Sequence, residues 1–411
     1  MSTSRDTITT RQATLARNAV MIVFAANGFG FASWMARIPQ IRDALGLQPS
    51  ELGRVLLALA IGAVIALPTS GFVVNKIGAA RTVAGGSVLA GGSLIMAGIG
   101  VDPIASVVAV AAFLATLGYG TGTWDVAMNV EGAAVERQLD RAIMPRFHAA
   151  FSLGTVLGAA LGAAATWLSI AVPIHLGVTG AAVIVVTLVS TRNFLPRQTE
   201  ESHDDATPAA PKVPVWHAWR EPRTLLIGLL VLSFALIEGI ANDWLAVGLV
   251  DGYEVSNAVG SAGFAVFVAA MTLGRLSGPW FLDRYGRAPV VRTSGLLAAT
   301  GAFLVVISGN LVLAGVGILL WGIGASLGFP VGMSAASDEP HLAPARVSVV
   351  ASIGYTAFLA GPPLLGWIGD HEGVLTALAV ATGAGLLGTS VASVLREKKT
   401  KTPERVDADR R

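Results

Sequence analysis

The stretch "GPWFLDRYGRA", residues 278–288, follows a long apolar run and is similar to a stretch much earlier in the chain. The earlier stretch is "GFVVNKIGAAR", residues 71–81, and the tetrapeptides that begin at Asn75 and Asp283 are 208 residues apart. A second pair, "SLGT" from Ser152 and "SIGY" from Ser352, recurs at a spacing of 200 residues. The same loop and the same apolar segment recur at the same position in the order of runs within each half of the chain. The sequence therefore predicts two related halves.

Apolar runs occupy most of the chain around these landmarks. Of its 411 residues, 53% are hydrophobic and 13% are charged, whereas about 25% of the residues of a soluble domain are charged. Each run is near or above the roughly 20 residues with which a helix crosses a bilayer, and the short alternating segments of a membrane β-barrel are missing. The sequence therefore predicts an all-α membrane protein with twelve transmembrane helices. They are expected at about residues 18–38, 51–74, 82–101, 104–130, 147–168, 171–191, 223–249, 258–281, 289–308, 311–335, 347–368 and 372–394.

Lysine and arginine residues gather in alternate loops and at both ends of the chain. They follow every even-numbered run, while the opposite loops contain only Arg37 and Arg42, with Arg54 just inside the next run. Positively charged loops stay on the cytoplasmic side of a membrane. The pattern predicts a multi-pass protein of the cytoplasmic (inner) membrane with both termini in the cytoplasm.

The longest polar stretch lies between runs six and seven and is rich in Pro, Ala and charge, which is typical of a linker. Its "SHDD", residues 202–205, is better interpreted as solvated charge than as a metal site, and the absence of cysteine excludes thiolate ligands. Neither a metal nor a cofactor is expected. The predicted segments are a cytoplasmic N-terminal segment 1–17, an N-terminal six-helix bundle 18–191, a cytoplasmic linker 192–222, a C-terminal six-helix bundle 223–395 and a cytoplasmic basic tail 396–411.

The paired loops are similar to the G-x-L-x-D-R-x-G-R loop of the major facilitator superfamily, and the resemblance extends over about residues 18–395. It implies two pseudo-symmetric six-helix bundles, with a solute site between them at mid-depth, in a monomer that works by alternating access. In that family the loop latches the cytoplasmic side of the outward-open state through charge pairs. Asn75 replaces the family's acid, so the latch of the N-terminal half is expected to be the weaker one. Arg275 is assigned to this latch in preference to a role in substrate binding. The residues assigned to the latch are Gly71, Asn75, Lys76, Gly78, Arg275, Asp283, Arg284, Gly286 and Arg287.

The segment "WDVAMN", residues 124–129, places an ionisable side chain inside run four. Asp125 and Asn129 are four residues apart and share one helix face. Charged groups inside a membrane are costly and usually functional, and a low-dielectric environment favours the protonated carboxyl group, which releases its proton when water enters. The motif also resembles the acid-x-A-x-N pattern of the fucose-permease branch, where the acid couples protons, although Met35 replaces that branch's second acid. The sequence predicts proton coupling by Asp125; the alternative is a solvated acid that pairs with a basic residue.

The segment "IEGIANDWL", residues 237–245, adds polar side chains to run seven. Glu238 and Asn242 share a face, and Glu238 is predicted as a second proton-coupling residue. Asp243 turns away from Glu238 and is interpreted as a solvated helix end. Aromatic side chains beside polar ones suit a small amphipathic molecule, although they also populate the membrane interface. The predicted substrate-binding residues are Asn27, Trp34, Tyr119, Asn129, Asn242, Trp321 and Tyr355.

These features predict a secondary active transporter of a sugar-like or other small solute, coupled to protons. The alternative is a proton-antiport exporter of drugs or metabolites, because none of these residues encodes the direction of transport. An enzyme, sensor or ATP-driven pump is disfavoured, since the chain has no phosphate-binding loop and no segment long enough for a soluble domain. The expected partners are the solute, protons and the lipid bilayer, and no nucleic acid.

Overall fold

Almost the whole chain is helical in the computed structural model, which describes all residues except 1–8, 142, 197–214, 340–341 and 397–411. The predicted linker and basic tail lie largely outside the described residues, as does the "SHDD" segment. The helices of the N-terminal half are α1 (Thr10–Met35), α2 (Ile38–Leu45), α3 (Pro49–Ile77), α4 (Ala79–Val101), α5 (Val107–Leu139), α6 (Met144–Trp167) and α7 (Val172–Thr191). Those that follow are α8 (Val215–Ala218), α9 (Pro222–Tyr253), α10 (Asn257–Tyr285), α11 (Arg287–Ile307), α12 (Leu311–Ala325), α13 (Gly328–Ala336), α14 (Ala343–Glu372), α15 (Val374–Ala377), α16 (Ala379–Val391) and the 3-10 helix η1 (Ala392–Leu395).

Twelve spans in the described part of the chain are long and apolar enough to cross a membrane, which confirms the predicted all-α membrane fold. Two of them are composite: α12 and α13 form the span Leu311–Ala336, and α15, α16 and η1 form Val374–Leu395. The sequence did not predict α2, which has eight residues, a proline in its first turn and a left-handed glycine, Gly46 (φ 62°), at its end. A segment this short and this polar carries no membrane signal.

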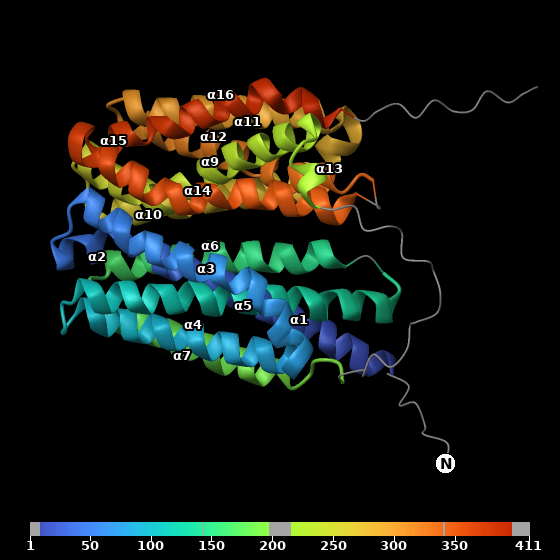
Figure 1. Cartoon of the computed structure of the whole chain (residues 1–411). Coiled ribbons are helices and arrows are strands. Elements are labelled where there is room, and N and C mark those ends of the chain that lie inside the picture. Colours follow the sequence, from blue (N-terminus) through green and yellow to red (C-terminus); the bar gives the residue numbers. More distant parts are fainter. Residues whose placement is uncertain (1–8, 142, 197–214, 340–341, 397–411) are drawn as a thin grey trace, which may run out of the picture.

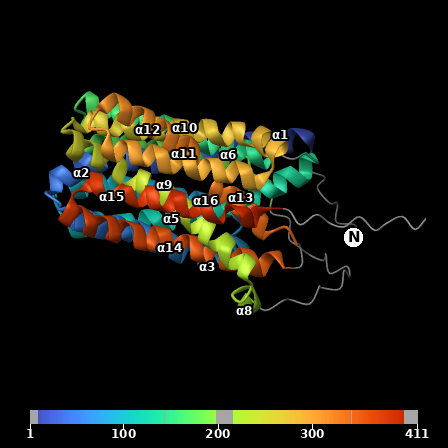
Figure 2. The same cartoon turned by 90° about the horizontal axis from the view of Figure 1, so that it is seen from above.

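The helices form two groups that lie side by side. Figure 1 shows α1 to α7 in one group and α9 to α16 in the other, and Figure 2 shows that the long helices keep a common direction in both. Within the first group α3 and α4 pack on α5, and α1 packs on α6; within the second, α11 packs on α12 and α9 on α14. Across the boundary α3 packs on α14 and α6 on α10.

The backbone conformation explains why both copies of the repeated loop contain a glycine between two helices. A single residue separates α3 from α4 and α10 from α11, namely Gly78 (φ 85°) and Gly286 (φ 78°). Residues with a side chain rarely adopt a positive φ. The last glycine of each copy therefore permits the sharp reversal between consecutive spans.

Close packing holds the N-terminal half together along one face of α6. A Cβ atom at Gly154 would collide with the backbone oxygen of Ala25, and one at Gly158 with the backbone oxygen of Phe29. Small residues at such spacing let two membrane helices approach closely. This spacing of glycines fixes α6 against α1, and thereby the wall of the central site that α6 provides.

The hydrogen bonds that join described residues of the two halves lie at one end of the molecule. We call this the α2 end, because α2 lies there, and we call the opposite end, where α1 begins, the termini end (Figure 1). The cross-half hydrogen bonds, all at the α2 end, join Arg42 to Asp251 (2.6 Å), Asn257 to Asp43 (2.8 Å), the Ser50 amide to Asp370 (3.0 Å) and the Ser261 hydroxyl to the Ala36 carbonyl (2.6 Å).

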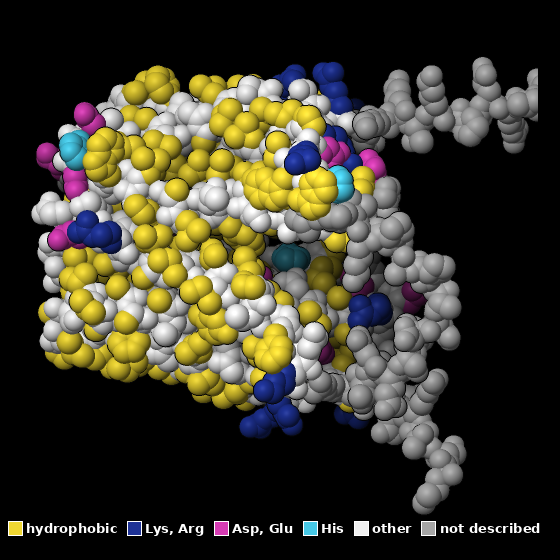
Figure 3. Space-filling view, viewed as in Figure 1, with side chains coloured by type: hydrophobic (Ala, Val, Ile, Leu, Met, Phe, Trp, Pro, Cys, Tyr) yellow, Lys and Arg dark blue, Asp and Glu magenta, His cyan; other side chains and the backbone are white. Residues whose placement is uncertain are grey.

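The surface is hollowed between the two groups of helices on the side of the termini end (Figure 3). Since the bonds across the boundary lie at the other end, the halves meet at the α2 end and diverge toward the termini end. The arrangement leaves a central space that is closed on one side.

Candidate solute-binding site

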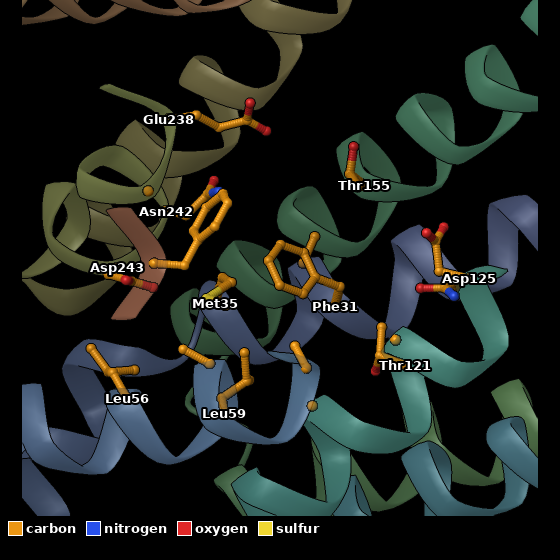
Figure 4. Close-up of a pocket in the computed structure, with 18 of the residues that line it drawn as sticks. Phe31, Met35, Leu56, Leu59, Thr121, Asp125, Thr155, Glu238, Asn242 and Asp243 are labelled. Carbon is orange, nitrogen blue, oxygen red and sulfur yellow. The ribbon is translucent and has the colours of Figure 1, made fainter. Parts of the chain in front are cut away.

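A cavity of about 360 Å³ lies between the two halves. Helices α1, α3, α5 and α6 line it from one half, and α9, α10 and α14 from the other. In Figure 4 Glu238 and Asp243 lie on one side of the cavity and Asp125 on the other. A change in how the halves are tilted would therefore change the environment of each acidic group.

Asp125 faces the cavity from α5 and is exposed to it. The Asn129 amide donates to the backbone oxygen of Asp125 at 2.9 Å and to its carboxylate Oδ1 at 3.4 Å. No ion pair between described residues includes Asp125. Tyr355 of the opposite half lies within electrostatic reach of this carboxylate. A carboxylate without a basic partner at a water-accessible position inside a membrane protein is able to take up and release a proton.

An ion pair crosses the C-terminal side of the cavity. One nitrogen of the Arg275 guanidinium, Nη2, lies 3.1 Å from each carboxylate oxygen of Glu238. The side chains of Arg275 and Glu238 are 29% and 20% exposed, so both keep contact with the cavity. Arg275, which the sequence assigned to the cytoplasmic latch, thus lies in the central site and ties α10 to α9.

Asp243 also lines this cavity, five residues after Glu238. The sequence interpretation of Asp243 as a solvated helix end is wrong, because the residue is half-buried and faces the space between the halves. No hydrogen bond or ion pair between described residues includes its carboxylate. The C-terminal half therefore presents one paired and one unpaired acid to the site.

The structure separates the predicted substrate-binding residues into two sets. Asn27, Asn242 and Tyr355 line the cavity. Four others lie outside its lining. Trp34 is fully buried; Tyr119 lies 3.2 Å from the Thr69 hydroxyl; Asn129 is bound to Asp125; and the Trp321 indole donates to the Ile237 carbonyl at 3.2 Å.

The predicted latch residues other than Arg275 lie at the ends of helices on both sides of the two glycines. Gly71, Asn75 and Lys76 belong to the last turns of α3, and Asp283 and Arg284 to the last turn of α10. Whether these residues latch the two halves stays a prediction.

Arg287 begins α11 and has a defined partner at the termini end. It donates to Asp338 at 2.6 Å, and Arg223 donates to the other oxygen of the same carboxylate at 2.9 Å. Burial acts to raise the pKa of Asp338, but hydrogen bonds and charge from the two arginines hold that pKa below its usual value. This cluster joins the start of α9, the start of α11 and the end of α13 within the C-terminal half.

Several cavity residues are not among the substrate-binding residues predicted from the sequence. Phe31 and Met35 project from α1 into the cavity (Figure 4), and Thr121 and Thr155 face it from α5 and α6. Apolar and hydroxyl side chains of this kind also face lipid or neighbouring helices in every span. Only the packing of the two halves distinguishes them.

Comparison with known proteins establishes the family. The profile of the Major Facilitator Superfamily matches residues 20–355. An uncharacterized MFS-type transporter of Yersinia pestis is 32% identical over 91% of this chain and 94% of its own length. The membrane protein MosC of Rhizobium meliloti is 25% identical over 94% of this chain and 91% of its own.

Solved structures agree on the fold at low sequence identity. A mutant of the nucleoside transporter NupG superimposes with a TM-score of 0.76 at 14% identity, covering 93% of this chain and 100% of that one. The E. coli fucose:proton symporter FucP superimposes with a TM-score of 0.63 at 14% identity, covering 94% and 100%. With the family profile and a relative above 30% identity over most of its length, the chain belongs to the Major Facilitator Superfamily of membrane transporters.

Proposed function

We propose that the protein is a secondary active transporter that carries a small amphipathic solute across the cytoplasmic membrane and couples this transport to the movement of protons. The observation that carries this proposal is the central cavity, which lies between the two halves, is closed at the α2 end and holds acidic groups from both sides. Alternating access in such folds proceeds by rocking of two bundles around a fixed central site.

The charge pattern supports the orientation. Positive charge lies in the loops after the even-numbered spans and at both ends of the chain. Because such charge stays on the cytoplasmic side, we place the termini end in the cytoplasm and the α2 end outside. In this orientation the described arrangement is open toward the cytoplasm.

We assign the proton to Asp125. It faces the cavity, has no basic partner among the described residues and matches the acid of the fucose-permease-like pattern. Asp243 shares the first two properties, so we propose it as a second candidate on the opposite half. Glu238, predicted from the sequence to share proton coupling, is bound to Arg275, and we assign that pair to the solute.

The lining indicates the class of solute. An ion pair, two amides and a phenol supply fixed polar contacts, from Glu238, Arg275, Asn27, Asn242 and Tyr355. Most of the remaining lining consists of aliphatic and aromatic side chains. Sites of this composition hold molecules with an apolar body and a few polar groups. A volume of about 360 Å³ fits a small metabolite rather than a peptide or lipid.

A solute found by thermal-shift screening of sugars, nucleosides, amino acids and vitamins is expected to exchange across proteoliposomes. A ligand that binds only the folded protein raises its stability by RT ln(1 + [L]/Kd), so millimolar concentrations reveal weak binders. Counterflow of the labelled solute is expected without a pH gradient, and uphill accumulation only with one. Accumulation that ignores the pH gradient would contradict proton coupling.

An exporter that works by proton antiport is the second candidate, because the largely apolar lining suits drug-like molecules as well. Cells that contain the protein would then survive higher concentrations of such compounds than cells with the Asp125→Asn variant. In an importer the same comparison gives no difference or greater sensitivity.

The cross-half bonds give a test of the rocking movement itself. Arg42 is 12% exposed and binds Asp251 of the opposite half. A partly exposed ion pair contributes about 1 kcal/mol at most, so Arg42→Gln is expected to shift the population toward opening of the α2 end up to about fivefold. Because the chain has no cysteine, spin labels at Ala44→Cys and Glu372→Cys report the distance between the halves there.

The matched control is Glu254→Gln, since Glu254 is an exposed residue at the end of α9 on the same side, and no hydrogen bond or ion pair between described residues includes its side chain. That variant is expected to keep the wild-type distance distribution. Equal distributions in all three proteins would show that the Arg42 bond does not hold the α2 end closed.

A further inference from the structure

Arg37 is a buried charge with almost no partner. It stands between α1 and α2 and is 2% exposed. Its Nη2 donates to the carbonyl of Ile170 at 2.6 Å, whereas Nε and Nη1 have no hydrogen-bond partner. A guanidinium has five N–H donors, and the described residues satisfy only one of them here. No described carboxylate forms an ion pair with Arg37.

The guanidinium lies in the wall of a second cavity, of about 550 Å³, at the α2 end. Gln40 lines the same cavity, and both polar atoms of its side-chain amide lack a partner. His175 of α7 lies within electrostatic reach of Arg37, and neither of its ring nitrogens has a partner. Asn257, from the C-terminal half, lines the cavity as well and has an unpaired Oδ1. Unsatisfied buried polar atoms of Arg37, Gln40 and Asn257 thus belong to the lining of one cavity, where a polar ligand would satisfy them.

The electrostatics of the cavity favour an anion. Burial lowers the pKa of Arg37 to about 10, so the guanidinium remains charged at neutral pH. A buried charge is costly unless it is paired. The first turn of the 20-residue helix α7, at Val172 and Pro173, lines the same space, and the N-terminus of a helix attracts negative charge. Asp102 is the one carboxylate in the lining; it is exposed and does not pair with Arg37.

We propose that this cavity binds a phosphate group at Arg37. A tetrahedral oxyanion offers several acceptors, which match the free N–H groups of Arg37 and the Gln40 amide better than a halide ion does. The group can come from inorganic phosphate or from a lipid headgroup. Trp167 lines the cavity and is 75% exposed, next to Leu168, which is 59% exposed. Trp167 ends the span Met144–Trp167, and an exposed tryptophan at the end of a span is typical of the membrane interface, so the cavity is expected to adjoin the bilayer.

The occupant would bridge the two halves. Arg37 and Gln40 belong to the N-terminal half, whereas Ser256 and Asn257 belong to the C-terminal half. A ligand that contacts both halves in one arrangement favours that arrangement by its difference in affinity. Phosphate at Arg37 is thus expected to stabilise the state in which the α2 end is closed. This inference stands independently of the solute and of proton coupling.

Thermal unfolding of the purified full-length protein in a neutral, phosphate-free detergent tests the proposal. Inorganic phosphate is added at matched ionic strength against chloride, and in a second arm a short-chain phosphatidylglycerol is added. The melting temperature of the wild type is expected to rise with concentration and to saturate in at least one arm. A response in the first arm identifies free phosphate, and a response in the second arm alone identifies the lipid headgroup.

Three variants place the site. Arg37→Gln is expected to abolish the rise, and Arg54→Gln, which changes an exposed arginine at the same end, to keep it. Gln40→Glu brings a built-in carboxylate to the cavity and is expected to fold and to lose the response, so the test survives if Arg37→Gln does not fold. The proposal is overturned if the wild type responds in neither arm, or if Gln40→Glu or folded Arg37→Gln responds like the wild type.

Discussion

Arg275→Gln is expected to weaken binding of the solute in the central cavity about ten- to hundredfold. The guanidinium faces the cavity while it holds both oxygens of Glu238. Its removal deletes a charged donor and leaves the Glu238 carboxylate without a partner inside the bundle. Hydrogen bonds to charged groups contribute about 1.5–3 kcal/mol, which corresponds to an increase in Kd of about ten- to hundredfold. The thermal shift with the solute identified by screening and its counterflow in proteoliposomes measure the loss.

A double variant distinguishes a direct contact of this ion pair with the solute from a purely structural role in joining α10 to α9. If the pair only ties α10 to α9, the double variant Glu238→Gln with Arg275→Gln removes both charges and recovers binding, because two amides can bond to each other. If the pair contacts the solute, the double variant binds it as weakly as Arg275→Gln although it is stably folded. Arg292→Gln, an exposed arginine at the start of α11, serves as the control and is expected to bind like the wild type. Recovery of wild-type binding by the double variant would refute the assignment of the pair to the solute.

The fold followed from the sequence because membrane helices depend on simple, local features. Length and apolar composition located the twelve spans, and the copies of one loop revealed the two halves. Each copy contains a glycine with positive φ between two helices, Gly78 and Gly286, and glycine is the residue that adopts this conformation readily. What remained invisible was α2, whose eight residues pack against the other half and have no periodic apolar pattern of membrane length.

The site followed less completely, because it depends on contacts between helices that are distant in sequence. The sequence assigns Arg275 to the cytoplasmic latch, whereas its ion-pair partner Glu238 lies on the neighbouring helix α9. Trp321 is predicted to bind substrate because it is aromatic, yet its indole is satisfied by the Ile237 carbonyl in the core. Rotation of a helix about its axis decides between these outcomes, and an apolar helix without an amphipathic pattern does not encode that rotation.

Asp125 combines a sequence signal with a suitable position, and it carries the central claim. A carboxylate that faces the cavity without a basic partner is the described group best placed to load a proton in one arrangement and release it in the other. Asn has the same shape as protonated Asp but does not titrate. Asp125→Asn is therefore expected to bind the solute and exchange it by counterflow, while concentrative transport is lost completely. Asp140→Asn, an exposed left-handed position at the end of the same helix, is the matched control, since Asn accepts that conformation.

The most direct measurement follows protons and solute together in proteoliposomes that enclose a pH-sensitive dye. When a gradient of the solute is imposed, the wild type and Asp140→Asn are expected to change the internal pH in proportion to solute flux. Asp125→Asn is expected to exchange the labelled solute and leave the internal pH unchanged. Proton movement by Asp125→Asn at the wild-type ratio to solute would contradict the account.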